Sequence, residues 1–267
     1  MTTTSQQATR PSVLHACYYT ANKSAENFVV DHVLMYIVSG TITFKTAARE
    51  YTFKEGDAVF LKGKQLAKAI KNPGASGEFK STSIFFDQAL LQEFSRTHNI
   101  QADATTQQEP IIQLSNNPLY AAYATSLIPY VQTSTSDALT KLKAEEGILL
   151  LLSIDKKVKD TLFDFTTPGK IDLESYMNSN FTFHADLKQF AYLTGRSLAT
   201  FKRDFEKIYH TSPNKWLQQK RLEEARYLIK EKGRRVSDVY LEVGFEDLSH
   251  FSFAFKKTFG VAPSHMA

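Results

Sequence analysis

The sequence has little cysteine, no long apolar run and no strong excess of one charge. Cys17 is the only cysteine among 267 residues, which excludes an intrachain disulfide and a zinc site built from several cysteines. No apolar stretch approaches the roughly 20 residues that a membrane helix needs, so no membrane segment is expected. Residues 1–12 are polar and rich in Thr and Gln, which predicts a disordered tail rather than a signal peptide. We therefore expect a cytoplasmic protein.

The net charge of +4 is distributed unevenly along the chain. Residues 1–167 carry 16 Lys+Arg and 16 Asp+Glu, whereas residues 168–267 carry 16 Lys+Arg and 12 Asp+Glu. The whole positive excess lies in the last hundred residues, which favours a neutral half joined to a half that binds a polyanion. A solvated helix face gives the same excess, so charge alone does not identify the partner.

The first half has the pattern of a β domain followed by helices. Short apolar runs alternate with turns at Ser39-Gly40 and Glu55-Gly56-Asp57, which is typical of a sandwich or small barrel. The expected strands cover residues 28–38, 41–44, 51–53, 58–61, 66–70 and 79–86. Helices are predicted from the N-cap Asp87 to residue 97 and over 117–132 and 136–159, with a loop over 100–113. A linker is expected at 166–169.

The second half is predicted to be entirely helical. The expected helices cover residues 172–178, 185–193, 197–209, 213–232, 237–243 and 248–259. Ser197 and Ser237 are predicted N-caps, Pro213 suits a first helical position, and Gly233 suits a C-terminal cap.

An internal repeat runs through these helices. Gly195 is followed ten residues later by Phe205 and eight later by Pro213; Gly244 is followed eleven later by Phe255 and eight later by Pro263. Phe201 and Phe251 stand four residues before the repeat phenylalanines, so each pair lies on one helix face and points to the core. The opposite face is left free, as in a helix-turn-helix that presents its second helix to the major groove.

The spacing of the repeats also fits DNA. A helix over 213–232 is about 30 Å long at about 1.5 Å per residue, and one turn of B-DNA spans about 34 Å. Two modules joined by this helix can place their second helices in successive major grooves. The alternative is a plain helical bundle with an accidental repeat.

The stretch VYLEVGFEDLSHF over 239–251, with its continuation FKKTFG over 255–260 and Pro263, resembles the signature of the AraC family of bacterial transcription regulators. The resemblance covers about 170–263 and includes Arg221 in the first copy. It departs from the family at His210, where a Gly is usual, at Tyr240, where a small Ala is usual, and at Phe253, where an Arg is frequent. It implies an α+β protein, in which a cupin-like β-barrel with helices over 13–165 precedes an all-α double helix-turn-helix domain over 170–267.

The matched positions give the expected DNA contacts. In the first module, Arg203 and Lys202 can donate to guanine O6 and N7; the alternative for Arg203 is an ion pair with Glu206 or Asp204. The helix over 136–159 carries a leucine stripe that packs on its own domain or forms a dimer contact: Leu139, Leu142, Leu149, Leu150 and Leu152. The predicted DNA-binding residues are Ala199, Thr200, Lys202, Arg203, Leu248, Ser249, His250, Phe253 and Lys256.

The first module is expected to supply most base-specific hydrogen bonds, and the second to act more through phosphate and apolar contacts. Additional phosphate contacts are expected from Lys215, Arg234, Arg235 and Lys257. The expected partners are double-stranded DNA, RNA polymerase and a second copy of the chain in a homodimer, together with a small-molecule or protein effector that the sequence leaves unidentified.

Two rival functions are a metal-dependent cupin enzyme and an adaptor that uses the helices to bind protein without binding DNA. An Fe or Zn site in a cupin needs several imidazoles and a carboxylate on facing strands. His15 and His32 are the only histidines before His98, and no His-x-His occurs. We therefore expect no metal site, no catalytic residues and no cofactor, and a sequence-specific DNA-binding regulator rather than an enzyme. Aromatic residues such as Phe28, Tyr36 and Phe60 line a pocket or, by default, fill the barrel core.

Overall fold

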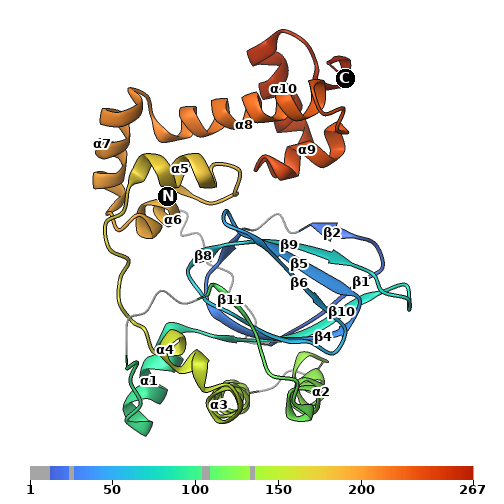
Figure 1. Cartoon of the computed structure of the whole chain (residues 1–267), viewed down its shortest axis with the longest axis vertical. Helices are drawn as coiled ribbons and strands as arrows, with labels where there is room; N and C mark the ends of the chain where they lie inside the picture. The colour runs from blue at the N-terminus through green and yellow to red at the C-terminus, as the bar shows by residue number, and fades with distance from the viewer. Residues whose placement is uncertain (1–12, 24–26, 104–108, 133–135, 267) are drawn as a thin grey trace, which may run out of the picture.

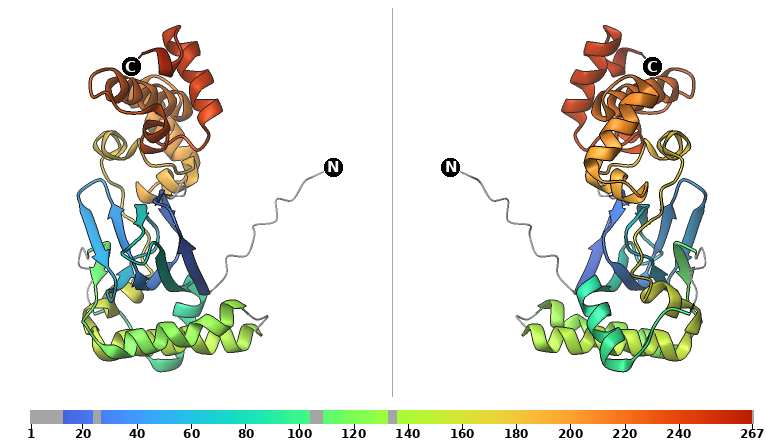
Figure 2. Two further views of the ribbon diagram at one scale, coloured as in Figure 1. Left: turned by 90° about the vertical axis from the view of Figure 1, so that its right-hand side faces the viewer. Right: turned by 90° about the vertical axis from the view of Figure 1, so that its left-hand side faces the viewer.

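A computed structural model describes residues 13–23, 27–103, 109–132 and 136–266. The predicted tail at 1–12 lies outside the described residues. The chain has a β-rich half and an all-helical half, and the helices that belong to the β-rich half lie on the side of its sheets away from the all-helical half (Figure 1, Figure 2). The predicted α+β organisation is confirmed.

Antiparallel pairing arranges the strands in a five-stranded sheet, β1-β10-β4-β7-β11, a four-stranded sheet, β2-β9-β5-β6, and a ribbon of β3 and β8. Among the described residues, the two larger sheets face each other, and no strand pairing closes them into the predicted barrel. The strands are β1 (Val13–Tyr18), β2 (Asn22–Lys23), β3 (Phe28–Val29), β4 (His32–Ser39), β5 (Thr41–Lys45), β6 (Glu50–Lys54), β7 (Ala58–Leu61), β8 (Gln65–Leu66), β9 (Lys68–Asn72), β10 (Phe79–Phe86) and β11 (Ile111–Gln113).

The five-stranded sheet is buried on both faces. Side chains alternate between faces along a strand, and all four residues of β7 are buried. Ala58 and Phe60 pack against the helices of this half, whereas Val59 and Leu61 pack between the sheets. An uninterrupted apolar run such as 58–61 is what a strand covered on both sides requires.

The helices beside this sheet are α1 (Gln88–His98), α2 (Pro118–Gln132), α3 (Asp137–Ile154), the 3-10 turn η1 (Lys156–Val158) and α4 (Lys159–Leu162). Asp87 caps α1 as predicted, because its Oδ1 accepts from Leu90 N at 2.8 Å. The prediction of one helix over 136–159 is wrong, since α3 ends at Ile154. The next residue, Asp155, is buried and accepts from the Tyr120 hydroxyl at 2.8 Å and the Ser115 hydroxyl at 2.7 Å.

Several strand predictions also need correction. The run over 28–38 is two strands, broken at Val30 and Asp31, and the run over 66–70 is divided between β8 and β9 at Ala67. Strands β1 and β2 were not predicted. The expected loop over 100–113 contains β11, which pairs with β7.

The helical half consists of α5 (Leu173–Asn180), α6 (Leu187–Leu193), α7 (Leu198–Tyr209), α8 (Pro213–Lys230), α9 (Val236–Glu242), α10 (Leu248–Phe259) and the 3-10 turn η2 (Pro263–His265). The expected helices are all present, with ends shifted by a few residues. Ser237 is not an N-cap, because α9 begins after Arg235. Gly233 has a φ of +61° but follows the α8 C-cap Glu231 by two residues. Among the described residues, none of the helices is long and apolar enough to cross a membrane.

The β3–β8 ribbon connects the two halves. Leu66 of β8 is 6% exposed and lies in the same hydrophobic cluster as Phe190, Phe205 and Trp216 of the helical half, with Phe28 of β3 packed against it. Lys68 of β9 donates to the Glu242 carbonyl of α9. The β half therefore contacts both ends of the helical half.

Candidate nucleic-acid interface

Two helix-turn-helix modules make up the helical half: α6 and α7 form the first, α9 and α10 the second, and α8 joins them (Figure 1). Each turn contains a glycine in the left-handed region, Gly195 with φ +66° and Gly244 with φ +95°. A side chain is strained in that region, and a Cβ at either glycine would also collide with backbone. The repeat glycines are therefore required by the turns.

The core face of both second helices is as predicted. Phe201, Phe205, Phe251 and Phe255 are fully buried, and their rings contact each other within each helix at 5.7 and 5.5 Å between centroids. Burial of these aromatic pairs fixes which side of α7 and α10 faces solvent. The repeat thus defines both the cores and the exposed faces of the modules.

The first recognition helix, α7, presents its cations to solvent. Ser197 caps it as predicted, accepting from Thr200 N at 3.2 Å. Ala199, Lys202 and Arg203 are exposed. Thr200 is half-buried and its hydroxyl accepts from Ser197 Oγ at 3.0 Å, so this hydroxyl is partly engaged within the cap.

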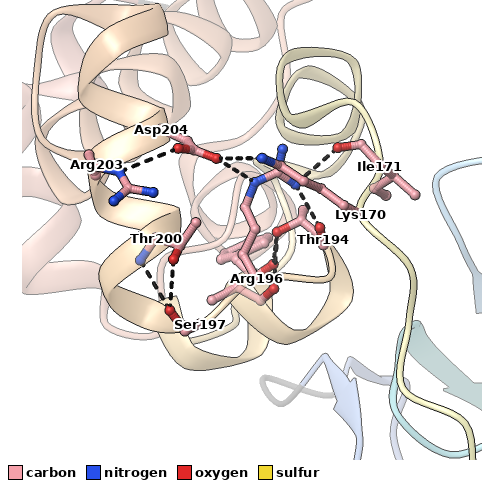
Figure 3. A network of polar contacts seen from close by, with 10 residues as sticks. Lys170, Ile171, Thr194, Arg196, Ser197, Thr200, Arg203 and Asp204 are labelled. Atoms are coloured by element: carbon pink, nitrogen blue, oxygen red, sulfur yellow. Dashed lines mark hydrogen bonds and ion pairs between the residues drawn. The ribbon is translucent and has the colours of Figure 1, made fainter.

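Asp204 of α7 binds Lys170, just before α5, and Arg196, and Arg203 lies at the outer end of the same network, paired with Asp204 (Figure 3). Asp204 Oδ2 lies 3.2 Å from both Lys170 Nζ and Arg196 Nε, and these hydrogen bonds hold the pKa of Asp204 below its ordinary value. Arg196, which is almost fully buried, also donates to the Ile171 and Thr194 carbonyls.

The alternative role for Arg203, an ion pair on its own helix, is present only as a long and exposed contact. Arg203 Nε is 3.8 Å from Asp204 Oδ1, and its side chain is 66% exposed. Because Asp204 already binds Arg196 and Lys170, the guanidinium of Arg203 retains its outward donors. Sequence reasoning named Asp204 only as an alternative partner of Arg203 and did not single out Arg196, because a buried Arg looks the same in sequence as a surface Arg.

The second recognition helix, α10, exposes two large apolar side chains among polar ones. Asp247 caps it, with Oδ1 accepting from His250 N at 2.6 Å. Phe253 is 69% exposed and Leu248 41%, both in positions predicted to touch DNA. Ser249, His250 and Lys256 are exposed as well. An exposed Phe on a helix with a complete core is free to contact the methyl groups of thymines.

Cations elsewhere on the helical half differ in availability. Lys215, Arg235 and Lys257 are exposed. Arg234 instead donates from Nη2 to Glu242 Oε2 at 2.8 Å, so its predicted phosphate contact competes with an ion pair. Arg221 is mostly buried, and burial lowers its pKa to about 10, which leaves it charged at neutral pH. It donates to the Phe181 and Phe183 carbonyls, both at 2.8 Å, and so has a structural role.

The histidines of the β half lie apart from one another. His32 stacks on Phe60 with 5.6 Å between centroids, and its Nδ1 accepts from Gly63 N at 3.2 Å. Burial, with Lys62 and Lys64 nearby, lowers the pKa of His32 to about 4. Within the described parts of the chain, no three His, Cys, Asp or Glu side chains gather as a metal site would require.

Comparison with known proteins covers both halves. Residues 32–165 match the family described as the ExsA N-terminal regulatory domain, and residues 190–267 match the family described as a helix-turn-helix domain. The chain belongs to the AraC family of transcription regulators. As an AraC-family member it is a DNA-binding transcription regulator, which confirms the function predicted from the repeat.

Its AraC-family relatives span nearly the whole chain. The thermoregulatory protein LcrF of Yersinia pestis is 26% identical over 253 residues, 88% of this chain and 90% of LcrF. The virulence regulon transcriptional activator VirF of Yersinia enterocolitica is also 26% identical over 253 residues, with the same shares of 88% and 90%. Among solved structures, wild-type ToxT of Vibrio cholerae aligns over 96% of this chain and 95% of its own, with 16% identity and a TM-score of 0.44.

Proposed function

We propose that the protein binds an asymmetric duplex site by placing α7 and α10 in two adjacent major grooves on one face of DNA. The supporting observation is the pair of capped, outward-facing helices joined by α8. This helix has 18 residues, and so a length of about 27 Å, somewhat shorter than the 34 Å of one DNA turn. In this proposal, the tilt of the two modules provides the remaining distance between α7 and α10.

Base reading is assigned mainly to the first module. Arg203 and Lys202 offer donors that suit guanine, whereas Leu248 and Phe253 offer apolar contacts. Lys256, Lys215, Arg235 and Lys257 contribute phosphate contacts, which position the protein without reading sequence.

Selection of bound fragments from a genomic DNA library, followed by footprinting, tests this assignment. On the selected site, Arg203→Ala is expected to lose about 1–3 kcal/mol of binding free energy, or about 5- to 150-fold in Kd. The loss should be confined to sites that carry the preferred base pair. Lys230→Ala removes an exposed charge from the end of α8 and serves as the control. An equal loss for Arg203→Ala on every sequence would assign Arg203 to a phosphate instead.

We propose further that α3 forms a homodimer contact. Leu139, Leu142 and Leu149 of α3 are 47%, 60% and 48% exposed, although Ile148 and Leu151 of the same helix are fully buried. A helix with an apolar stripe on its outer face, beyond the stripe that packs on its own domain, is suited to pair with a second copy.

Two matched leucine variants separate dimerisation from DNA binding. Leu149→Asp should convert the protein to a monomer, measured by sedimentation equilibrium, and leave the far-ultraviolet circular dichroism unchanged. Leu248→Asp, on α10, should leave the dimer intact and weaken DNA binding. An unchanged mass for Leu149→Asp would remove α3 from the interface.

The chain is proposed to act in the cytoplasm through binding rather than catalysis, with RNA polymerase as a partner. The activator VirF among its relatives supports the polymerase contact. The rival metal-dependent cupin enzyme requires stoichiometric Fe, Zn or Mn in the purified protein, which elemental analysis measures. The adaptor alternative predicts that the protein is not retained on duplex DNA, whereas the regulator should be retained and released by salt.

A further inference from the structure

The loop between α5 and α6 is a junction of three parts of the molecule. On the β side, Asn27, which is 2% exposed, accepts from His184 N through Oδ1 at 2.7 Å. On the α8 side, the buried Arg221 binds the carbonyls of Phe181 and Phe183. The backbone of this loop is therefore fixed from two directions.

The His184 side chain extends from this loop to the second module. Its Nδ1 is 3.3 Å from the Gly244 carbonyl oxygen, and its Nε2 is 3.0 Å from Glu246 Oε1. Both partners lie in the turn between α9 and α10, directly before the α10 N-cap Asp247. The same turn approaches the loop so closely that a Cβ on Gly244 would lie 2.6 Å from the Thr182 carbonyl oxygen.

The contact between His184 and the α9–α10 turn restrains the relative orientation of the two modules, which α8 alone does not. Modules attached only to the two ends of one helix can tilt relative to each other when that helix bends or when its end residues rotate. A link away from the helix axis, from the start of α6 to the start of α10, restricts that tilt. Because two major grooves must be entered at once, the relative orientation of α7 and α10 determines how well both helices reach bases.

We propose that His184 is a positioning residue that sets the orientation of α10 relative to α7, with Asn27 transmitting the position of the β half to it. This inference rests on the proposed two-groove binding mode. It assigns a role in DNA recognition to a residue outside both recognition helices. A shift of the β half would reach the start of α10 through Asn27 and His184, beside the direct contact of Lys68 with the Glu242 carbonyl of α9.

The first test uses the free, full-length protein and does not depend on DNA. In His184→Ala, amide hydrogen exchange over 244–250 should accelerate about tenfold, which corresponds to the loss of one charge-assisted hydrogen bond. Exchange over 198–209, in α7, should not change. Glu246→Ala removes one partner of the imidazole at an exposed position, so it tests the same link without disturbing the loop between α5 and α6. His265→Ala, at an exposed histidine near the C-terminus, is the control.

The second test separates positioning from a direct contact. The full selected site is compared with a duplex in which the half-site of α10 is scrambled. For His184→Ala, Kd on the full site should rise about tenfold, and Kd on the scrambled duplex should equal that of the wild type. His184→Gln keeps a donor near the Nε2 position and should recover part of the difference. Glu246→Ala combined with His184→Ala should add no further loss.

Several results would overturn the inference. Equal losses on both duplexes would indicate a phosphate contact or general destabilisation, and unchanged exchange over 244–250 would show that His184 does not hold the turn. If the wild type bound both duplexes equally, the two-groove proposal would be wrong, whereas the exchange result would still show whether His184 orders the start of α10.

Discussion

Gly147 of α3 marks a place where α2, α3 and the sheet are packed without spare room. A Cβ at this position would lie 2.6 Å from the Tyr123 hydroxyl oxygen of α2 and 3.2 Å from Phe86 Cζ of β10. The Tyr123 hydroxyl cannot simply rotate away, because it donates to the Lys143 carbonyl at 2.5 Å and the ring is buried. Gly147→Ala therefore tests how rigidly the helices are seated on the sheet.

The expected cost combines two opposing effects. Ala is favoured over Gly inside a helix by about 1 kcal/mol, whereas an extra methyl group in a filled core costs about 1–3 kcal/mol. With contacts as short as these, the steric cost is expected to prevail, and the free energy of unfolding should fall by about 1–2 kcal/mol. The Tyr123→Phe change removes the hydroxyl that the methyl group meets and loses its hydrogen bond, at about 1 kcal/mol. In that background, Gly147→Ala should cost at least about 1 kcal/mol less.

Urea denaturation of the four proteins, followed by circular dichroism, measures this coupling. The unfolding slope should stay constant across the series, so that midpoints report stability. Stabilisation by Gly147→Ala in the wild-type background, or the same cost in both backgrounds, would contradict the packing argument. Either result would mean that α2 and α3 adjust their spacing freely.

Three further predictions concern single residues. His32 has a folded pKa of about 4, below its unfolded value of about 6.5, so the folded protein requires the neutral imidazole. The free energy of unfolding should therefore fall as the pH drops from about 6.5 to 4. His32→Asn, which retains an acceptor for Gly63 N, should remove that part of the acid loss when urea midpoints are measured against pH. His210, with φ +53°, stands at the α7 C-cap, and His210→Gly should raise the free energy of unfolding by about 0.5–1 kcal/mol; a lower melting temperature would show that the imidazole has a compensating contact. Asp155→Ala leaves the Tyr120 hydroxyl and the Ser115 groups without their acceptor and should cost about 2–5 kcal/mol in urea denaturation, whereas a near-neutral result would show that water replaces the carboxylate.

The sequence predicted the recognition helices more accurately than the β half. Helix 248–259 was located to the residue, because its Asp cap, its buried pair Phe251 and Phe255, and its terminal Gly260 are all local signals. Strand β11 has no such signal: Ile111–Gln113 is three residues long and is a strand only through its pairing with β7. Likewise, no local pattern around Asp155 predicts that this residue is buried and ends α3.

The residues of the candidate interface also differ in how well the sequence predicts them: local patterns predict the exposed faces, but not the polar contacts that hold the helices in place. The repeat identified the faces of α7 and α10, and all the contact residues predicted on these two helices except the half-buried Thr200 are exposed. The residues that hold these helices in place, Arg196, Arg221 and His184, are polar side chains whose partners are distant in sequence. A single sequence does not reveal such partners, because nothing local distinguishes a buried cation from a solvated one.

The position of Leu66 limits how the two halves can be recombined with those of other regulators. This side chain belongs to the β half by sequence and to the core of the first helix-turn-helix module by packing. A chimera that joins this helical half to a foreign β half would leave a void in the cluster that includes Phe190 and Trp216, unless the foreign ribbon also carried a large apolar residue there. Voids of this size typically cost about 2–5 kcal/mol. An exchange point at the predicted linker, residues 166–169, would therefore not separate two independent cores. Functional chimeras should require an exchange that keeps residues 27–29 and 65–68 with the helices they contact.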